Sequence, residues 1–413
     1  MTAPGDVAPT VAPTPAPAAA SPRPAWMYLS AFVVLGISSS LLGPALSGLR
    51  VRTGARLATI SVLFVVSALG YLAGSVASGI GYDRRYGHRL MGAGLLLLAA
   101  GLLLVAWAPT LPWLVVVFPL LGFAGGTIDV GGNTLLVWSK GRSAGPFLNA
   151  LHLCFGVGAL LAPLLVNRAL AWTDGVGAAF AVTAVPAVVA AAILLVRASP
   201  APVDAEGHDS GGHAPRRLLA AVAFFFFLYV GVEVGFGGWV YTYAQQIRLG
   251  GPNVPAILTA VFWGSFTLGR LLSVWLAHRL PAARLLAVSC LVAAGAALGL
   301  VVADGAALAV WVGTVLFGLG TAPQFATMIA FAERHLPLTG EATSWFLGAA
   351  ALGSLFMPWL IGQLLEARGA RAMPVAVFVA ATATVAWFAV LRRLLVHRAA
   401  EAPTGGRSAG SLG

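Results

Sequence analysis

The chain is divided into twelve apolar segments, each close to the length that crosses a lipid bilayer as one helix. A spanning helix needs about 20 apolar residues, because in hydrocarbon the backbone must satisfy its own hydrogen bonds. The chain is 59% hydrophobic and only 9% charged, whereas soluble domains carry about 25% charged residues. The segments are 26–49, 57–82, 90–108, 113–137, 146–166, 176–196, 218–243, 254–276, 285–302, 306–330, 342–365 and 372–390. The sequence therefore predicts an all-α membrane protein with twelve transmembrane helices.

The second half of the chain repeats the first at a constant offset of 195 residues. The matching pairs are Gly36 and Gly231, Gly43 and Gly238, Gly74 and Gly269, Ser78 and Ser273, Arg84 and Arg279, Arg89 and Arg284, Gly158 and Gly353, and Pro163 and Pro358. One offset along a whole half indicates that a six-helix module was duplicated. We therefore expect two six-helix bundles, at residues 26–197 and 218–398.

The remaining segments are polar and rich in small residues. Residues 1–25 repeat Ala, Pro and Thr without an apolar core, which predicts a disordered tail and no cleavable signal peptide. Residues 198–217 suit a flexible cytoplasmic linker, and 399–413 a disordered C-terminal tail. His208 and His213 in the linker are too few and too loosely held to predict a metal site. We expect no metal and no cofactor.

The distribution of basic residues predicts the orientation, because Lys and Arg are retained on the cytoplasmic side. Most of the 24 lie in segments on the same side as both termini, which are therefore expected to be cytoplasmic. The same bias explains the net charge of +11 without nucleic-acid binding, which would need a basic face on a soluble fold. The excess of Arg over Lys, with abundant Ala and Gly, favours a bacterial cytoplasmic (inner) membrane. We expect a multi-pass monomer.

Two carboxylic acids lie near the middle of apolar segments, Asp129 in the fourth and Glu233 in the seventh. An ionised side chain at this depth costs roughly 2.5–3.5 kcal/mol, so such residues usually have a function. The two acids lie in opposite halves, where a central cavity would bring them face to face. Because burial favours the protonated form of a carboxyl group, both are candidates for proton coupling.

Polar neighbours of the two acids are candidate substrate ligands. Asn133 shares a helix face with Asp129, and Asn149 shares one with His152. Hydrogen bonding between helices would explain the two asparagines about as well as ligand binding does. A role in gating is a further alternative for Asn149, which lies close to the cytoplasmic end of its segment. The adjacent glycines suit either helix packing or the approach of a ligand.

The segment around Glu233 contains Gly231, Gly235, Gly237 and Gly238, which predicts a place where the helix can bend or unwind. Trp239 follows, and its ring could stack on a sugar. In the repeat, Ser38 corresponds to Glu233 and Gln324 to Asp129. These two residues and Arg270, in the eighth segment, complete the candidate substrate site; Arg270 could instead snorkel to the interface or pair with a carboxylate.

The string Gly79-Ile80-Gly81-Tyr82-Asp83-Arg84-Arg85-Tyr86-Gly87-His88-Arg89 resembles the G-x-x-x-D-R-x-G-R-R signature of the major facilitator superfamily. The resemblance implies that Asp83, Arg84 and Arg89 form a conformational latch on the cytoplasmic side. An ordinary charged turn at a helix end is the alternative interpretation. The second-half copy has His278 in place of Asp83, so a latch there would differ.

Residues 125–133, 148–158 and 231–239 resemble the fucose, galactose and glucose symporter branch of that superfamily, and the similarity spans nearly the whole chain. The first helix departs from the proton-coupled fucose carriers, which have an acid where this chain has Ser38, Ser39 and Ser40. The resemblance therefore implies the major facilitator fold and a sugar carrier, but not fucose as the cargo.

We accordingly expect a secondary active transporter that moves a small polar solute, a sugar, with protons or alternatively sodium. Two other functions stay open. A proton-coupled drug or metabolite exporter would have the same fold, and a membrane receptor would keep the fold without transport. The sequence contains no pair of nucleophile and base and no phosphate-binding loop, so an enzyme is not expected.

Overall fold

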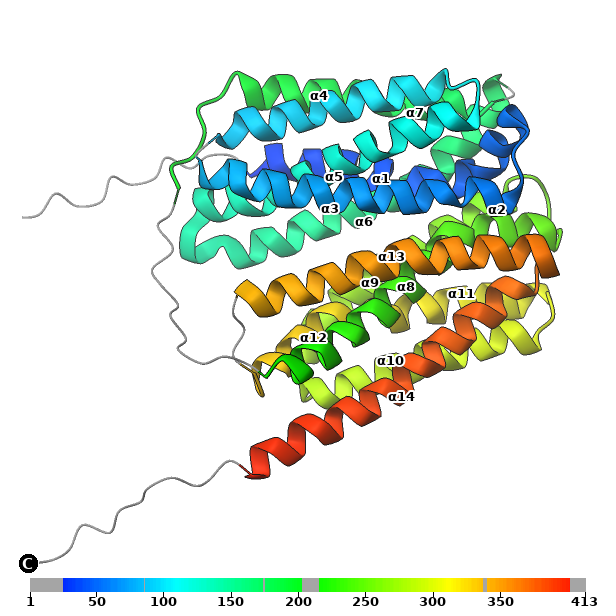
Figure 1. Cartoon of the computed structure of the whole chain (residues 1–413). Helices are drawn as coiled ribbons and strands as arrows, with labels where there is room; N and C mark the ends of the chain where they lie inside the picture. The colour runs from blue at the N-terminus through cyan, green and yellow to red at the C-terminus, as the bar shows by residue number, and fades with distance from the viewer. Residues whose placement is uncertain (1–24, 85, 174, 203–214, 337–339, 402–413) are drawn as a thin grey trace, which may run out of the picture.

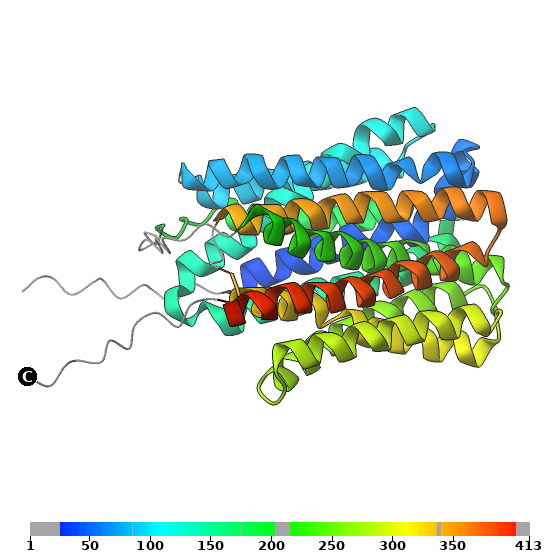
Figure 2. The ribbon, with the colours of Figure 1, turned by 60° about the horizontal axis from the view of Figure 1, so that its bottom comes forward.

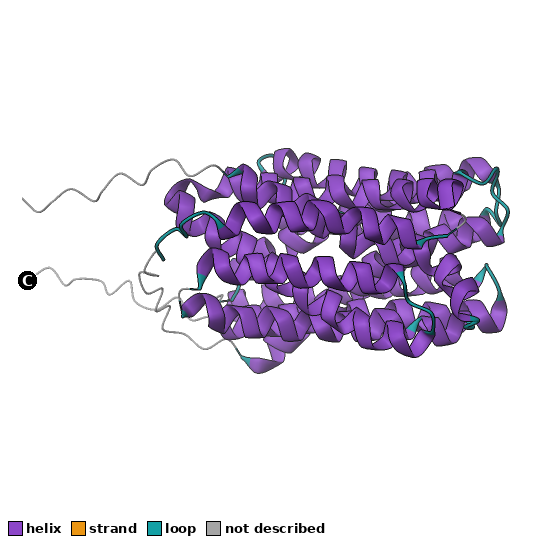
Figure 3. Cartoon of the chain, turned by 90° about the horizontal axis from the view of Figure 1, so that it is seen from above, coloured by secondary structure: helices purple, strands orange, loops and turns teal. Residues whose placement is uncertain are grey.

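All regular structure in the part of the chain described by this computed structural model is helical (Figure 3). The described residues are 25–84, 86–173, 175–202, 215–336 and 340–401. Most of the predicted tails and of the predicted linker therefore lie outside the described residues, although residues 399–401 of the predicted C-terminal tail belong to a helix. Within the described residues, twelve helical spans are long and apolar enough to cross a membrane, which confirms the twelve predicted segments.

The helices of the first half are α1 Trp26–Thr53, α2 Leu57–Ile60, α3 Val62–Asp83, α4 Gly87–Ala106, α5 Leu111–Lys140, η1 Gly141–Ser143, α6 Ala144–Thr173 and α7 Gly177–Leu195. Those of the second half are α8 Arg216–Gln246, α9 Val254–Ala277, α10 Ala282–Val302, α11 Ala307–Thr321, α12 Gln324–Glu333, α13 Gly340–Arg368 and α14 Ala372–Glu401. Two spans are interrupted, between α2 and α3 at Ser61 and between α11 and α12 at Pro323, which cannot donate a helical hydrogen bond.

The two halves form two bundles with the same internal packing (Figure 1). In the first, α1 packs on α6, α3 on α5 and α4 on α7; in the second, α8 packs on α13, α9 on α11 and α10 on α14. The halves meet through α1 on α8, α6 on α9, and α13 on α2 and α3. Figure 2 shows α13 running alongside α3. We call the end where α1 begins and α14 ends the terminal end, and the opposite end the far end.

Repeated glycines bring the helix pairs into backbone contact. A Cβ atom on Gly158 would collide with the carbonyl oxygen of Val33, and one on Gly353 with that of Phe227. Both contacts join the first and fifth spans of their half. The sequence repeat is therefore also a repeat of packing, in which small residues let helices approach closely.

The glycines near Glu233 also pack helices together, and the helix is not unwound there in this structure. Helix α8 is continuous from Arg216 to Gln246. Its glycines face Met357 of α13, Trp263 of α9 and Phe64 of α3. An unbroken helix keeps its backbone hydrogen bonds satisfied in hydrocarbon, and the glycines provide the room for three neighbouring helices.

The close packing predicts a difference between two glycines of α13. Gly353→Ala should destabilise the protein by about 2 kcal/mol, because the new methyl group meets the backbone of α8. Gly348→Ala is the control on the same helix, where a Cβ meets nothing within 4 Å. This change should be neutral or stabilising by up to about 1 kcal/mol, since Ala favours the helix. Thermal unfolding in detergent measures both, and equal effects would contradict the packing argument.

Candidate functional site

Asp129 lies near the middle of α5 and is held by two side chains. The hydroxyl of Tyr71 on α3 donates to its Oδ2 atom. Asn133 donates from Nδ2 to the Oδ1 atom at 3.1 Å and to the Asp129 backbone oxygen at 2.9 Å. Gly126 lets α3 come this close, because a Cβ there would strike the backbone of Tyr71. The structure thus brings together the predicted pair of Asp129 and Asn133 and adds a tyrosine.

Glu233 has a similar partner on its own helix. Tyr229, one turn earlier on α8, donates its hydroxyl hydrogen to Oε2 of Glu233. The Tyr229 ring is 1% exposed and packs against Phe225 and Phe325, so its position is fixed by aromatic neighbours. Each acid therefore receives a hydrogen bond from a tyrosine in its own half.

Arg270 on α9 is half-buried, with its guanidinium carbon 4.6 Å from the ring centre of Phe266. Its helix packs on α6 of the first half and on α8, the helix of Glu233. No ion pair among the described residues joins Arg270 to Asp129 or to Glu233. The two acids and the cation are therefore not paired with one another in this structure.

His152 and Asn149 are exposed on one face of α6, as their spacing predicts. The His152 ring meets the buried ring of Phe32 on α1 edge-on, with centroids 6.2 Å apart. Gly156, one turn further along the same face of α6, packs against Thr267 of α9, with which a Cβ atom would collide. This face of α6 therefore points between the two halves and not toward lipid.

Three predicted ligands are placed differently. Trp239 is 0% exposed, packs on Phe64 and donates its indole N–H to the backbone oxygen of Pro358 at 2.7 Å, so its ring is covered in this state. Gln324 is 2% exposed and donates to the Gly320 backbone oxygen at 3.1 Å inside the second bundle. Ser38 is half-buried on α1. The structure does not bring these three side chains into contact with the two acids.

The predicted latch lies at the terminal end. Asp83 is the last residue of α3, and its side chain lies outside the described part of the structure. Arg84 and Arg89 are exposed at the end of α3 and the start of α4. The role of these three residues stays a prediction. No cluster of three His, Cys, Asp or Glu that could hold a metal occurs among the described residues.

Tyr71 and Tyr229 are site residues that the sequence analysis missed. Tyr229 precedes Glu233 by four residues, so helical spacing alone could have indicated it. Tyr71 lies 58 residues before Asp129 and on another helix. No local pattern in the sequence connects those two residues.

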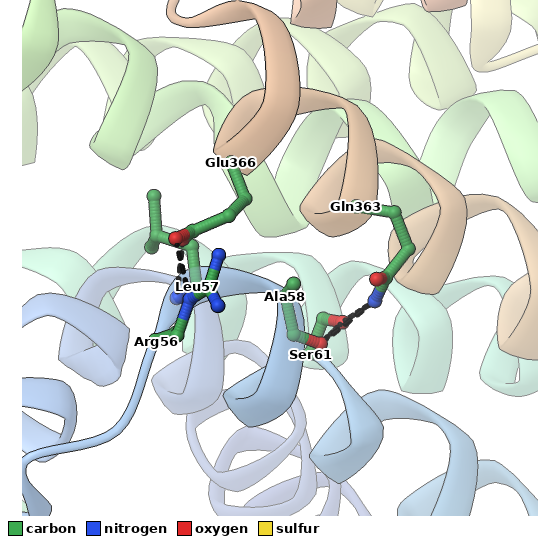
Figure 4. Close-up of polar contacts among 6 residues, drawn as sticks. All are labelled: Arg56, Leu57, Ala58, Ser61, Gln363 and Glu366. Atoms are coloured by element: carbon green, nitrogen blue, oxygen red, sulfur yellow. Dashed lines mark hydrogen bonds and ion pairs between the residues drawn. The ribbon is translucent and has the colours of Figure 1, made fainter.

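Several hydrogen bonds join the two halves at the far end. Ser47 donates to Gln245 at 2.5 Å, Asn167 to Asn253 at 2.9 Å, and Gln363 to the backbone oxygen of Ala58 at 2.7 Å (Figure 4 shows the last). These contacts close the interface between the halves at the far end.

Two homologous six-helix bundles that enclose charged residues in mid-membrane and close at one end define a carrier-type membrane protein. The chain belongs to the Major Facilitator Superfamily, whose sequence profile matches residues 28–358. Members of this superfamily are carriers and not enzymes.

Similar proteins agree with this assignment. A sodium-dependent glucose transporter 1A of Mus musculus is 29% identical over 379 residues, which cover 82% of this chain and 88% of that protein. A sodium-dependent glucose transporter 1 of Xenopus laevis is 30% identical over 355 residues, covering 79% and 72%. A bacterial homologue of the human lysosomal transporter Spinster, solved in an inward-facing and occupied conformation, matches with a TM-score of 0.74 at 13% identity, covering 90% and 97%.

The tyrosine bond to Asp129 predicts a measurable coupling. Tyr71→Phe should destabilise the protein by about 1.5–3 kcal/mol, because it removes a hydrogen bond to a carboxylate. With Asp129→Asn already present, the same change should cost about 1 kcal/mol less. Tyr82→Phe on the same helix is the control, since its hydroxyl donates only a long hydrogen bond, 3.4 Å, to the neutral backbone oxygen of Thr127. Its effect should be smaller and should not depend on Asp129. Thermal unfolding of the four variants in detergent tests this, and strict additivity would contradict it.

Proposed function

We propose that this chain carries a sugar across the membrane by alternating access and that a cation bound at Asp129 and Glu233 drives the transport. The observation that carries the proposal is the placement of two acids near the middle of spans from opposite halves, each hydrogen-bonded by a tyrosine. Groups from both halves can bind one ligand only at the interface that opens and closes in such a carrier.

Charge balance favours one coupling cation per cycle. With both acids ionised, Asp129, Glu233 and Arg270 together carry one excess negative charge. A net charge in a low-dielectric region is costly, and one proton or one Na⁺ removes it. The two tyrosine hydroxyls stabilise the ionised carboxyl groups while the cation is absent.

Two coupling cations fit the site. The sequence analysis favours a proton, because a buried carboxyl group readily takes one up. The similarity to sodium-dependent glucose transporters favours Na⁺, and carboxylate and hydroxyl oxygens are suitable ligands for a hard cation. The experiment below separates the two.

The cargo proposed from the same relatives is glucose or another hexose. Asn149 and His152 would hydrogen-bond its hydroxyl groups from α6, and Asn133 would do so from α5. Trp239 could offer its ring to the sugar only after the far end opens, since it is covered here. Gln324 and Ser38 are proposed to act in that second state.

The orientation and location are part of the proposal. The excess of Lys and Arg on the side of the termini supports cytoplasmic termini in a bacterial inner membrane. The far end then faces outward, and the state described here is closed on the outer side. The latch of Asp83, Arg84 and Arg89 would form when the terminal end closes. We propose that the carrier works as a monomer, since each chain contains both halves.

Gradient-driven uptake tests the coupling. Proteoliposomes containing the chain should accumulate a labelled hexose from a panel under an inward H⁺ or Na⁺ gradient. An interior potential of −100 mV adds about 2.3 kcal/mol per charge, or roughly fiftyfold accumulation. Asp129→Asn and Glu233→Gln should each abolish accumulation, because neutral side chains no longer exchange the cation. The gradient that drives uptake identifies the cation.

Asp304→Asn is the matched control, because Asp304 is a far-end acid paired with Arg371 at 3.8 Å and exposed to solvent. Its uptake should equal that of the unmodified chain. Failure of every sugar to move, while a cationic dye is expelled against a proton gradient, would replace the sugar carrier with a drug exporter. Movement of neither class would favour a receptor.

Substitution of the proposed substrate ligands on α6 should change the affinity for the sugar, whereas substitution of the two acids should abolish accumulation. Asn149→Ala and His152→Ala should each raise the half-saturating sugar concentration about three- to tenfold, as expected for one lost hydrogen bond. Maximal uptake should change less than twofold, since the coupling acids remain. A loss of maximal rate with unchanged affinity would instead indicate a gating role.

A further inference from the structure

One acid of α13 reaches across the interface to the interrupted second span. Glu366 accepts a hydrogen bond from Nε of Arg56 at 2.9 Å through Oε1 and from the backbone N–H of Leu57 at 3.0 Å through Oε2 (Figure 4). Leu57 is the first residue of α2, and the first N–H groups of a helix have no partner within it. A residue of the second half therefore completes a helix of the first half.

The contact continues along the same face of α13. Gln363 donates to the backbone oxygen of Ala58 at 2.7 Å and to the Ser61 hydroxyl at 3.2 Å. One residue earlier, Gly362 packs on Ser61 and on the Trp239 ring. Ser61 is 0% exposed and lies at the break between α2 and α3. This face of α13 thus contacts the second span from the start of α2 to the break at Ser61.

The repeat provides an internal comparison. At the related interface of α6 and α9, Asn167 donates to Asn253 at 2.9 Å. Asn253 corresponds to Ala58, and Asn167 is one position from the counterpart of Gln363, so the amide contact exists on both sides. The ion pair does not, because Gly251 takes the place of Arg56 and Ala171 that of Glu366. The charged contact is therefore present at one of the two related interfaces and not at the other.

From this geometry we infer that the Arg56 and Glu366 pair is a one-sided lock that holds the far end closed and sets the balance between the two open states. All of its hydrogen bonds join the two halves, so opening the far end breaks them together. These hydrogen bonds therefore stabilise the form that is closed at the far end and not the form that is open there. An interaction shifts an equilibrium between two conformations only if it stabilises one more than the other. The lock is independent of the cargo and of the coupling ion.

The size of the effect follows from exposure. The Arg56 side chain is 74% exposed and that of Glu366 is 23% exposed. Exposed ion pairs contribute little, but a carboxylate that also accepts a backbone N–H contributes more. We expect loss of the lock to raise the fraction of molecules open at the far end about three- to tenfold. A carrier balanced between two states would change its cycling rate accordingly.

The test measures access to Ser61 from solution. The parent chain carries Cys154→Ala, Cys290→Ala and Ser61→Cys, and a membrane-impermeant maleimide labels the new thiol only when the far end opens. Arg56→Gln and Glu366→Gln should each raise the labelling rate about three- to tenfold. The double variant should label no faster than either single variant, because both remove the same interaction. The exchange Arg56→Glu with Glu366→Arg should return the rate toward that of the parent.

Asp304→Asn is again the matched control, since its ion pair with Arg371 also lies at the far end but stays within the second half. Its labelling rate should equal the parent's. Equal rates in the parent and both lock variants would overturn the proposal, as would an equal acceleration by Asp304→Asn. Thermal unfolding of each variant in detergent separates opening from loss of the fold, because an opened but folded protein keeps its cooperative transition. Labelling needs no substrate, so the result is independent of the proposed sugar.

Discussion

Helices surrounded by lipid gain little hydrophobic energy from touching one another, so this fold depends on how closely their backbones can approach. Gly158 and Gly353 meet that requirement at equivalent places in the two halves, where any side chain would collide with a neighbouring carbonyl oxygen. The same principle lets α8 pack against three neighbouring helices without a break and lets α3 reach Asp129 at Gly126. Close packing by glycine thus positions the charged groups as well as the bundles.

The charged centre follows from the cost of ions in a low-dielectric region. Asp129 and Glu233 are each hydrogen-bonded by a tyrosine, and no ion pair among the described residues joins Arg270 to either acid. Acids without an ion-pair partner leave room for the transported cation proposed above. The incomplete pairing therefore fits the proposed coupling.

The two related halves differ at the far end. Both interfaces have an amide contact, whereas among the described residues the charged contact of Arg56 with Glu366 occurs at the interface of α2 and α13 alone. The family motif with Asp83 is expected at the opposite end. A carrier with a charged latch at each end has two closed forms, and the difference between the latches determines which one predominates.

The sequence by itself determined the twelve spans, the two halves and the shared helix face of Asp129 and Asn133. Hydropathy, the repeat and helical spacing all depend on residues near one another in the chain or at a fixed offset, so they can be read without coordinates. Only the tertiary structure decided that Tyr71 binds Asp129, that Trp239 is covered, and that Glu366 caps α2 from the other half. These contacts depend on how each helix is rotated and where it crosses its neighbours. Rotation and crossing are set by side-chain packing between distant segments, for which one sequence contains no local signal.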